Sequence, residues 1–143
     1  MPTETITVRQ AYEALAKNGF RHLREAWTKE DIEGVITGGC LLQQGALNLG
    51  VRNHDGNNSL YEQLNKYSSR NQHGAMEPLG RALVMWNDAK IYNYEKQKYR
   101  WVLPTYKAVI KKAYELMEPH FNKTLELEKR EWAFKRKEDL VKV

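Results

Sequence analysis

The sequence predicts a mainly α fold: a compact helical domain of five to six helices over residues 1–119, then a charged C-terminal helix extension over residues 120–143. Three observations indicate this class. Capping motifs precede apolar residues at helical spacing. All nine glycines lie between Gly19 and Gly80 and punctuate the first part of the chain. The last segment is charged but rich in helix formers. With 143 residues the chain can bury one core.

The first helix is expected to begin after Thr7. Thr7 and Gln10 form a capping box, in which the threonine hydroxyl and the glutamine side chain satisfy each other's backbone N–H groups. Gly19 supplies the left-handed cap that ends the helix. The apolar positions in between follow one helical face: Val8, Ala11, Tyr12, Leu15 and Ala16.

The next part of the chain is expected to hold two further helices. An N-cap signature at Thr28 predicts a short helix that ends before the Gly38-Gly39 pair. Residues 40–49 are expected to be helical despite Gly45, which costs about 1 kcal/mol relative to alanine.

Three more helices follow a Gly/Asn-rich loop at residues 50–58. Ser59 and Glu62 form a second capping box, and Pro78 suits the first turn of the next helix. Pro104 opens the clearest helix of the chain, which Pro119 ends or kinks. Its apolar stripe is Tyr106, Val109, Ile110, Ala113 and Met117.

Two C-terminal segments are less regular. Residues 90–103 mix strand-favouring aromatic and β-branched residues with lysines, so they form either a short β-hairpin or an irregular arm. Residues 121–139 favour a helix, but only Leu125 and Trp132 share an apolar face. This last helix is therefore expected to project from the domain or to dock on another surface.

The charge of the chain is uneven, and its cysteine and acidic residues argue against disulfides and metal sites. Residues 90–143 carry fourteen Lys/Arg against eight Asp/Glu, whereas residues 1–89 carry nine against ten. A single cysteine cannot form an internal disulfide or a multi-thiolate zinc site. Residues 51–62 resemble a calcium loop, but Val51 stands where the first carboxylate is needed. No cofactor or metal is expected.

The N-terminus carries no signal pattern, and no apolar run is long enough to span a membrane. We therefore expect no membrane association and a cytoplasmic protein, which would mean the host cytoplasm or the virion if a phage encodes it.

One set of residues has the types of a thiol hydrolase. Cys40 lies near a predicted helix start, where a thiol pKa can fall. His54 or His73 could act as its base, and Asn87 could orient the imidazole. The alternative is that Cys40 is a small core residue, which is commoner for a lone cysteine in an apolar run.

The 92–101 arm is the strongest candidate for binding. Aromatic faces stack on bases while cations hold phosphates, so the composition suits single-stranded nucleic acid. Tyrosine, tryptophan and arginine are also the usual anchors of protein interfaces, and a purely structural role is the third alternative. The candidate partner-binding residues are Tyr92, Tyr94, Lys96, Lys98, Tyr99, Arg100 and Trp101 in the arm, with Trp132, Phe134 and Arg136 in the last helix.

Several short motifs resemble a family of small uncharacterised proteins of bacteriophages and actinobacteria. They span roughly residues 27–113, and the arm between Asp88 and Thr105 departs from the family's pattern. The resemblance implies a phage-type origin and a helical fold, and it implies no reaction. The residues that carry it are Trp27, Cys40 with Gly45-Ala46-Leu47, Trp86-Asn87-Asp88, and Thr105 with Val109 and Ala113.

Together these observations predict a non-enzymatic, phage-type interaction or assembly protein. It would bind a protein partner, or a second copy of itself, through the arm and the C-terminal helix. The first alternative is a nucleic-acid-binding protein that uses the 92–101 arm. The second is a Cys-dependent hydrolase around Cys40.

Overall fold

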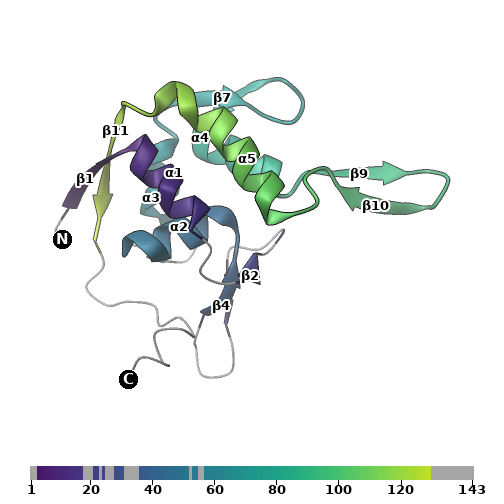
Figure 1. The fold of residues 1–143 in the computed structure, drawn as a ribbon, viewed down its shortest axis with the longest axis horizontal. Coiled ribbons are helices and arrows are strands. Elements are labelled where there is room, and N and C mark those ends of the chain that lie inside the picture. The colour runs from purple at the N-terminus through teal and green to yellow at the C-terminus, as the bar shows by residue number, and fades with distance from the viewer. Residues whose placement is uncertain are drawn as a thin grey trace.

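The computed structural model describes residues 3–17, 21–22, 24, 28–30, 36–51, 53–54 and 57–129. Within these ranges the fold mixes helices with small sheets, so the prediction of a mainly α protein is wrong (Figure 1). The helices are α1 (Val8–Ala16), α2 (Leu41–Leu49), α3 (Ser59–Leu64), α4 (Leu79–Asn87) and α5 (Tyr106–Met117), followed by the 3₁₀ turn η1 (Glu118–His120).

The described strands form four two-stranded sheets and one three-stranded sheet. The pairs β1–β11, β5–β6, β7–β8 and β9–β10 are antiparallel, and β4 lies between parallel β2 and antiparallel β3. The strands are β1 (Thr3–Thr7), β2 (Arg21–His22), β3 (Thr28–Glu30), β4 (Ile36–Gly39), β5 (Asn53–His54), β6 (Asn57–Asn58), β7 (Ser68–Arg70), β8 (Met76–Pro78), β9 (Lys90–Asn93), β10 (Lys98–Trp101) and β11 (Thr124–Glu128).

The predicted capping box of α1 is confirmed, and α5 begins with Thr105 as its cap rather than at the predicted Pro104. Thr7 accepts from the backbone N–H of Gln10, whose side chain accepts from the backbone N–H of Thr7. Thr105 accepts from the N–H of Ala108 at 3.1 Å and so begins α5. These short-range bonds satisfy N–H groups that a helix start leaves free, which is why local sequence predicts them.

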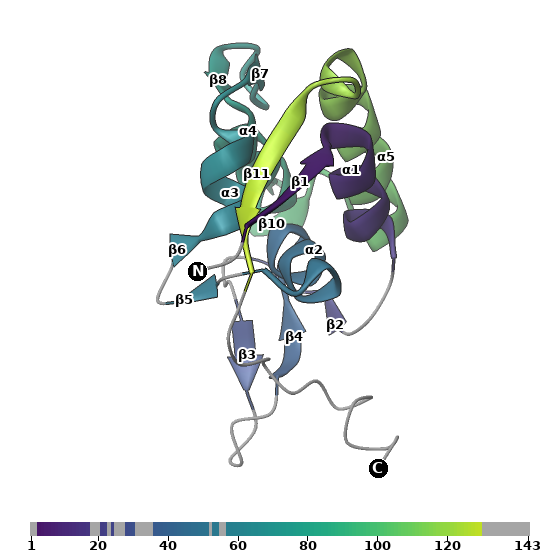
Figure 2. The same cartoon turned by 90° about the vertical axis from the view of Figure 1, so that its left-hand side faces the viewer.

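The predicted C-terminal helix is wrong where the structure describes it. Residues 124–128 form β11, which pairs with β1 in a register that sets Ile6 opposite Leu125 (Figure 2). Leu125 and Leu127 point into the core, while Thr124 and Glu126 face solvent. This alternation has the period of a strand, and the strand ties residues up to Glu128 to the core of the predicted helical domain. Residues 130–143 lie outside the described residues.

The short helix predicted after Thr28 is also wrong at its described ends. Thr28–Glu30 is strand β3, and the Gly38-Gly39 pair continues strand β4 instead of breaking the chain. The register places Gly39 of β4 opposite His22 of β2.

The core lies between the five helices and the inner face of the β1–β11 sheet. Gly45 permits close packing here: a Cβ at this position would lie 2.4 Å from Cδ2 of Leu15, so any side chain would force Leu15 to shift where α1 packs on α2. The largest fully buried apolar side chains are Leu15, Leu41, Leu42, Leu60, Leu64, Leu79, Leu83, Met117, Leu125 and Leu127. No helix in the described ranges is both long and apolar enough to cross a membrane.

Candidate functional site

The arm predicted at 90–103 is an antiparallel hairpin that projects from the helical body (Figure 1). Among the described strands, β9 pairs only with β10, and Val102 donates its N–H to the Ala89 carbonyl at 2.9 Å to close the base of the hairpin. At the turn, Lys96 donates its N–H to the Asn93 side chain at 3.0 Å. The sequence left hairpin and irregular arm open, and the structure has the hairpin.

The two faces of the hairpin have different chemistry. Residues opposite each other in an antiparallel pair share a face. Tyr92 therefore lies beside Tyr99, and their ring centroids are 4.9 Å apart. Tyr94 adds an edge-on contact to Tyr92, also at 4.9 Å. Tyr94 is 84% exposed and Tyr99 is 62% exposed, so this aromatic face meets solvent. The other face carries Lys98 and Arg100.

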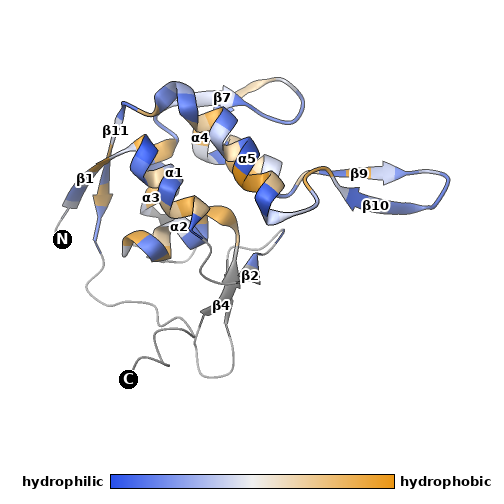
Figure 3. Cartoon of the chain, in the orientation of Figure 1, coloured by the Kyte–Doolittle hydropathy of each residue, from blue (hydrophilic) through white to orange (hydrophobic). Residues whose placement is uncertain are grey.

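The net positive charge of the protein is concentrated at this hairpin and the helix that follows it. Residues 90–112 carry seven Lys/Arg and one Asp/Glu, a net charge of +6, whereas the rest of the chain has a net charge of −1. Figure 3 shows the hairpin largely in hydrophilic colours, with hydrophobic segments on the central helices. The start of α5 adjoins the base of the hairpin (Figure 1). The cations are Lys90, Lys96, Lys98, Arg100, Lys107, Lys111 and Lys112.

Arg24 holds the hairpin on the body. Its guanidinium donates to the Asn87 carbonyl at 2.6 Å and to the Leu103 carbonyl at 2.5 Å, and it lies 4.9 Å from the centroid of the Trp101 ring. One side chain thus joins the end of α4, the exit of the hairpin and its last aromatic residue. Arg24 could not be identified from the sequence, because no local pattern marks a residue that bonds segments more than sixty positions away.

A hollow of about 450 Å³ lies at the base of the hairpin. Its wall includes the Trp86 indole, whose Nε1–H donates to the Arg70 carbonyl at 3.1 Å. The Lys112 ammonium lies 4.4 Å from the centroid of the same indole. The polar side chains that line the hollow are Gln72, His73, Asp88 and Lys90.

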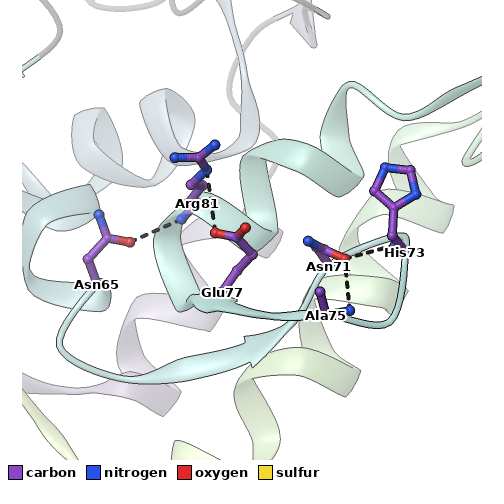
Figure 4. A network of polar contacts seen from close by, with 6 residues as sticks. All are labelled: Asn65, Asn71, His73, Ala75, Glu77 and Arg81. Carbon is purple, nitrogen blue, oxygen red and sulfur yellow. Dashed lines mark hydrogen bonds and ion pairs between the residues drawn. The ribbon is translucent and has the colours of Figure 1, made fainter.

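The β7–β8 turn places two of these side chains. Asn71 is buried, and its side-chain oxygen accepts from the N–H groups of His73 at 2.8 Å and Ala75 at 3.1 Å (Figure 4). An asparagine that bonds the backbone two residues on fixes a turn locally. Farther along β8, the Glu77 carboxylate lies 3.4 Å from Arg81. The turn is therefore held by its own bonds, and it carries Gln72 and His73 at the edge of the hollow.

Asn87 has a histidine partner, but neither of the two that the sequence suggested. Its Oδ1 lies 2.5 Å from Nε2 of His22, and its Nδ2 donates to Asp88 at 2.8 Å. Burial lowers the pKa of His22, and nearby Arg24 lowers it further against the opposing effect of the Asn87 bond. Because an amide oxygen only accepts, His22 donates to Asn87 through Nε2–H.

Cys40 is placed as a core residue. It is 4% exposed at the start of α2, and burial raises the pKa of its thiol to about 12, against the lowering effect of the nearby Gln43 and Leu42 backbone N–H groups. At neutral pH only about one thiol in 10⁵ would be ionised. A nucleophile needs the thiolate, so the geometry gives no support to a thiol hydrolase. His73 instead lies at the hollow, and the backbone of His54 lies in β5.

The remaining predicted site residues divide into two groups. The arm residues from Tyr92 to Trp101 are brought together on the hairpin, while Trp132, Phe134 and Arg136 lie outside the described residues. Within the described ranges, no group of three or more His, Cys, Asp or Glu side chains is arranged to hold a metal ion.

Comparison with protein-family models, with curated proteins and with solved structures found no match for this chain. The resemblance to phage and actinobacterial proteins stays a prediction.

Proposed function

We propose that this is a non-enzymatic protein that binds single-stranded nucleic acid through the β9–β10 hairpin and the start of α5. The observation that carries the proposal is the position of the charge. The whole net positive charge of the chain lies in residues 90–112, and these residues follow one another from the hairpin into the adjoining helix. Charge concentrated on one element is the electrostatic footprint of a polyanion partner.

The two faces of the hairpin supply the two interactions that single strands need. Tyr94 and Tyr99 present exposed rings on which unstacked bases can stack. Lys98 and Arg100 lie on the opposite face of the same ribbon, within reach of a backbone that passes along it. Base stacking is indifferent to sequence because every base has an aromatic face, so this contact would favour single strands of any sequence.

The mounting of the hairpin supports a binding role. A two-stranded ribbon is marginally stable alone in water. Here Arg24 bonds both ends of the ribbon's attachment and covers Trp101, so the tyrosines are presented from a fixed base. A pre-organised contact surface loses less conformational entropy on binding.

The test is fluorescence anisotropy with a labelled oligothymidylate of about twenty nucleotides. About four phosphate contacts predict that log K falls with log salt with a slope of about −3. Replacing Lys98 and Arg100 with alanine should weaken binding about tenfold and make the slope shallower. The matched control removes two exposed lysines elsewhere, Lys17→Ala with Lys66→Ala, and should leave the affinity within about twofold.

The second candidate is a protein partner, in the phage-type interaction or assembly role predicted above. The exposed Tyr94 and Tyr99 favour it, because tyrosine anchors protein interfaces. Absence of oligonucleotide binding at about 50 mM salt would overturn the nucleic-acid proposal and leave this candidate, since phosphate contacts are strongest at low salt.

A further inference from the structure

The outer edge of strand β9 presents backbone groups that the hairpin itself does not bond. Val102 donates its N–H to the carbonyl of Ala89, the residue opposite it when the register of the ribbon is continued toward the body. Hydrogen-bonded and non-hydrogen-bonded pairs alternate along an antiparallel ladder, so Tyr92 and Tyr99, three pairs farther out, form a non-hydrogen-bonded pair. The backbone N–H and C=O of Tyr92 therefore point out of the ribbon at the β9 edge, and those of Tyr99 point out at the β10 edge.

Both edges of the ribbon can accept another strand. The hairpin projects from the helical body, and no third strand within the described ranges pairs with it (Figure 1). An unpaired edge is a template for strand pairing, and sheets of three or more strands are more stable than an isolated ribbon. A strand added to this ribbon would therefore stabilise it, and the charges of the two edges determine which edge accepts one.

The two edges differ in charge. Residues 97–103, which include β10, carry two Lys/Arg and no Asp/Glu. Residues 88–96, which include β9, carry two of each and have no net charge. Like charges placed opposite each other destabilise a strand pair, so the β10 edge repels a copy of itself whereas the β9 edge does not.

The charges along β9 are also arranged so that this edge is complementary to itself. Asp88 and Lys90 lie at the base of the hairpin, and Glu95 and Lys96 lie at its tip. In an antiparallel pair of ribbons, the tip of one ribbon meets the base of the other. With Tyr92 on the two-fold axis, Lys96 of one copy lies opposite Asp88 of the other. Glu95 of each copy then lies next to Lys90 of the other, so an acid meets a base at both ends.

We propose that two copies of this chain pair through their β9 strands about a two-fold axis at Tyr92, so that the two hairpins form one four-stranded antiparallel sheet. Opposite residues share a face, so the tyrosines of both hairpins continue a single aromatic surface across the axis. Tyr94, which is 84% exposed in one copy, lies opposite Lys90 of the other. A lysine over a tyrosine ring is favourable, and the Lys90 ammonium already lies 4.9 Å from the centroid of the Tyr99 ring in its own hairpin.

The inference goes beyond the proposed function and does not depend on it. The β10 strands form the outer edges of the four-stranded sheet, so Lys98 and Arg100 remain open to nucleic acid. Pairing only a few residues of each strand gives a small interface, and small interfaces are weak and transient. We therefore expect a dissociation constant on the order of 100 µM.

Disulfide trapping tests the register. The Cα atoms of a hydrogen-bonded antiparallel pair are about 5.5 Å apart, which a disulfide can span. Tyr92→Cys should therefore give about tenfold more disulfide-linked dimer than Tyr99→Cys, the matched variant at the β10 edge, when both are oxidised at about 200 µM protein. Cys40 is the sole native cysteine and is buried, so it does not compete. Equal cross-linking of the two variants, or none of Tyr92→Cys, would overturn the proposal.

Hydrogen exchange of the wild-type protein tests the same contact without a substitution. The Tyr92 N–H meets water in a single copy and bonds the second copy in the pair, so its exchange should slow about fivefold between about 20 µM and about 2 mM protein. The Tyr99 N–H points out of the opposite edge and should exchange at the same rate at both concentrations. Equal slowing at both edges, or no slowing at either, would contradict pairing through β9.

A charge variant separates the self-complementary edge from an effect of overall charge. Lys96→Glu sets an acid opposite Asp88 of the second copy and should weaken the dimer about fivefold in sedimentation equilibrium, through both symmetric contacts. Lys98→Glu makes the same charge change on β10 and should not weaken the dimer. Equal weakening by the two variants would overturn the register. Absence of a dimer would leave the nucleic-acid proposal intact, because each hairpin carries its own Lys98 and Arg100.

Discussion

Two ribbons of this molecule have the same topology and opposite roles. The β1–β11 and β9–β10 pairs are both isolated two-stranded antiparallel sheets. Leu125 in β11 is fully buried, whereas Ile91 in β9 is 47% exposed and Tyr99 in β10 is 62% exposed. One ribbon closes the core, and the other leaves both faces open. The exposed ribbon adds little to the core, and binding segments are commonly drawn from such parts of low local stability.

The two ribbons also differ in charge. The solvent face of β1–β11 carries Glu126 and Glu128. Glu4 lies on the same face as Leu127 and pairs with Lys129. The hairpin and the start of α5 have a net charge of +6. Variants in matched positions of the two ribbons should therefore separate stability from binding.

The largest effect is expected in the buried ribbon. Leu125→Ala should lower the free energy of unfolding by about 2–5 kcal/mol, because it leaves a cavity in the core. Its counterpart Ile91→Ala should cost less than about 1 kcal/mol, since this side chain is half exposed. Denaturant unfolding measures both. Similar losses for the two variants would show that the hairpin is part of the folding core and would break the comparison.

Binding affinity, unlike stability, should depend on the hairpin and not on the β1–β11 ribbon. Lys98→Glu with Arg100→Glu should weaken oligothymidylate binding about a hundredfold at low salt, through lost phosphate contacts and added repulsion. The melting temperature should stay the same, because both side chains are exposed. In β11, Glu126→Lys should not weaken binding. Fluorescence anisotropy and thermal unfolding are measured for the hairpin variant and for Glu126→Lys. An equal loss of affinity in both variants would show that the hairpin is not the binding site.

Removing the Arg24 bonds that attach the hairpin to the helical body should have a smaller effect on stability. Arg24→Met keeps the side-chain length but loses the bonds to the Asn87 and Leu103 carbonyls, and it should lower the free energy of unfolding by about 1–3 kcal/mol. Hydrogen exchange should rise first in the hairpin amides and remain slow in β1–β11. The matched control is Arg81→Met, whose exposed ion pair with Glu77 is worth about 0.5 kcal/mol or less. Uniform acceleration across both ribbons would contradict this role.

The smallest expected effect is a loss of folding stability at alkaline pH. The folded thiol of Cys40 has a pKa of about 12 against a reference of 9.0, so the unfolded chain releases this proton first as the pH rises. Stability is therefore retained below pH 9 and falls between pH 9 and 12, by about 1.4 kcal/mol at one unit above the reference value. Cys40→Ala should remove that part of the pH dependence. An unchanged slope in this variant, or rapid thiol labelling of the folded protein at neutral pH, would contradict the buried placement.

Much of the helical structure could be predicted from local sequence. The bonds at Thr7 and Thr105 join residues three positions apart, and the apolar stripe of α5 repeats at helical spacing, so nearby residues contain the signal. The β11 strand was missed because leucine and glutamate favour helices, and its five residues are shorter than a convincing alternation. Its partner β1 lies about 120 residues away along the chain.

The residues of the candidate site could likewise be predicted only in part. The aromatic and basic residues of the arm could be found by composition, because they are consecutive. Arg24 and His22 could not, since each bonds residues that only the fold brings close. For Cys40 the residue types suggested a thiol hydrolase, but the thiol is buried. Burial of a single side chain cannot be read from the spacing of residues in the sequence.

The central claim is that the hairpin and the start of α5 form the surface that binds nucleic acid. Amide chemical shifts followed during titration with unlabelled oligothymidylate test it most directly. We predict that the largest changes fall within residues 90–112 and in the adjoining turn at Gln72 and His73, with small changes in β1–β11. Changes centred on β1–β11 or on α1, or none at low salt, would contradict the account.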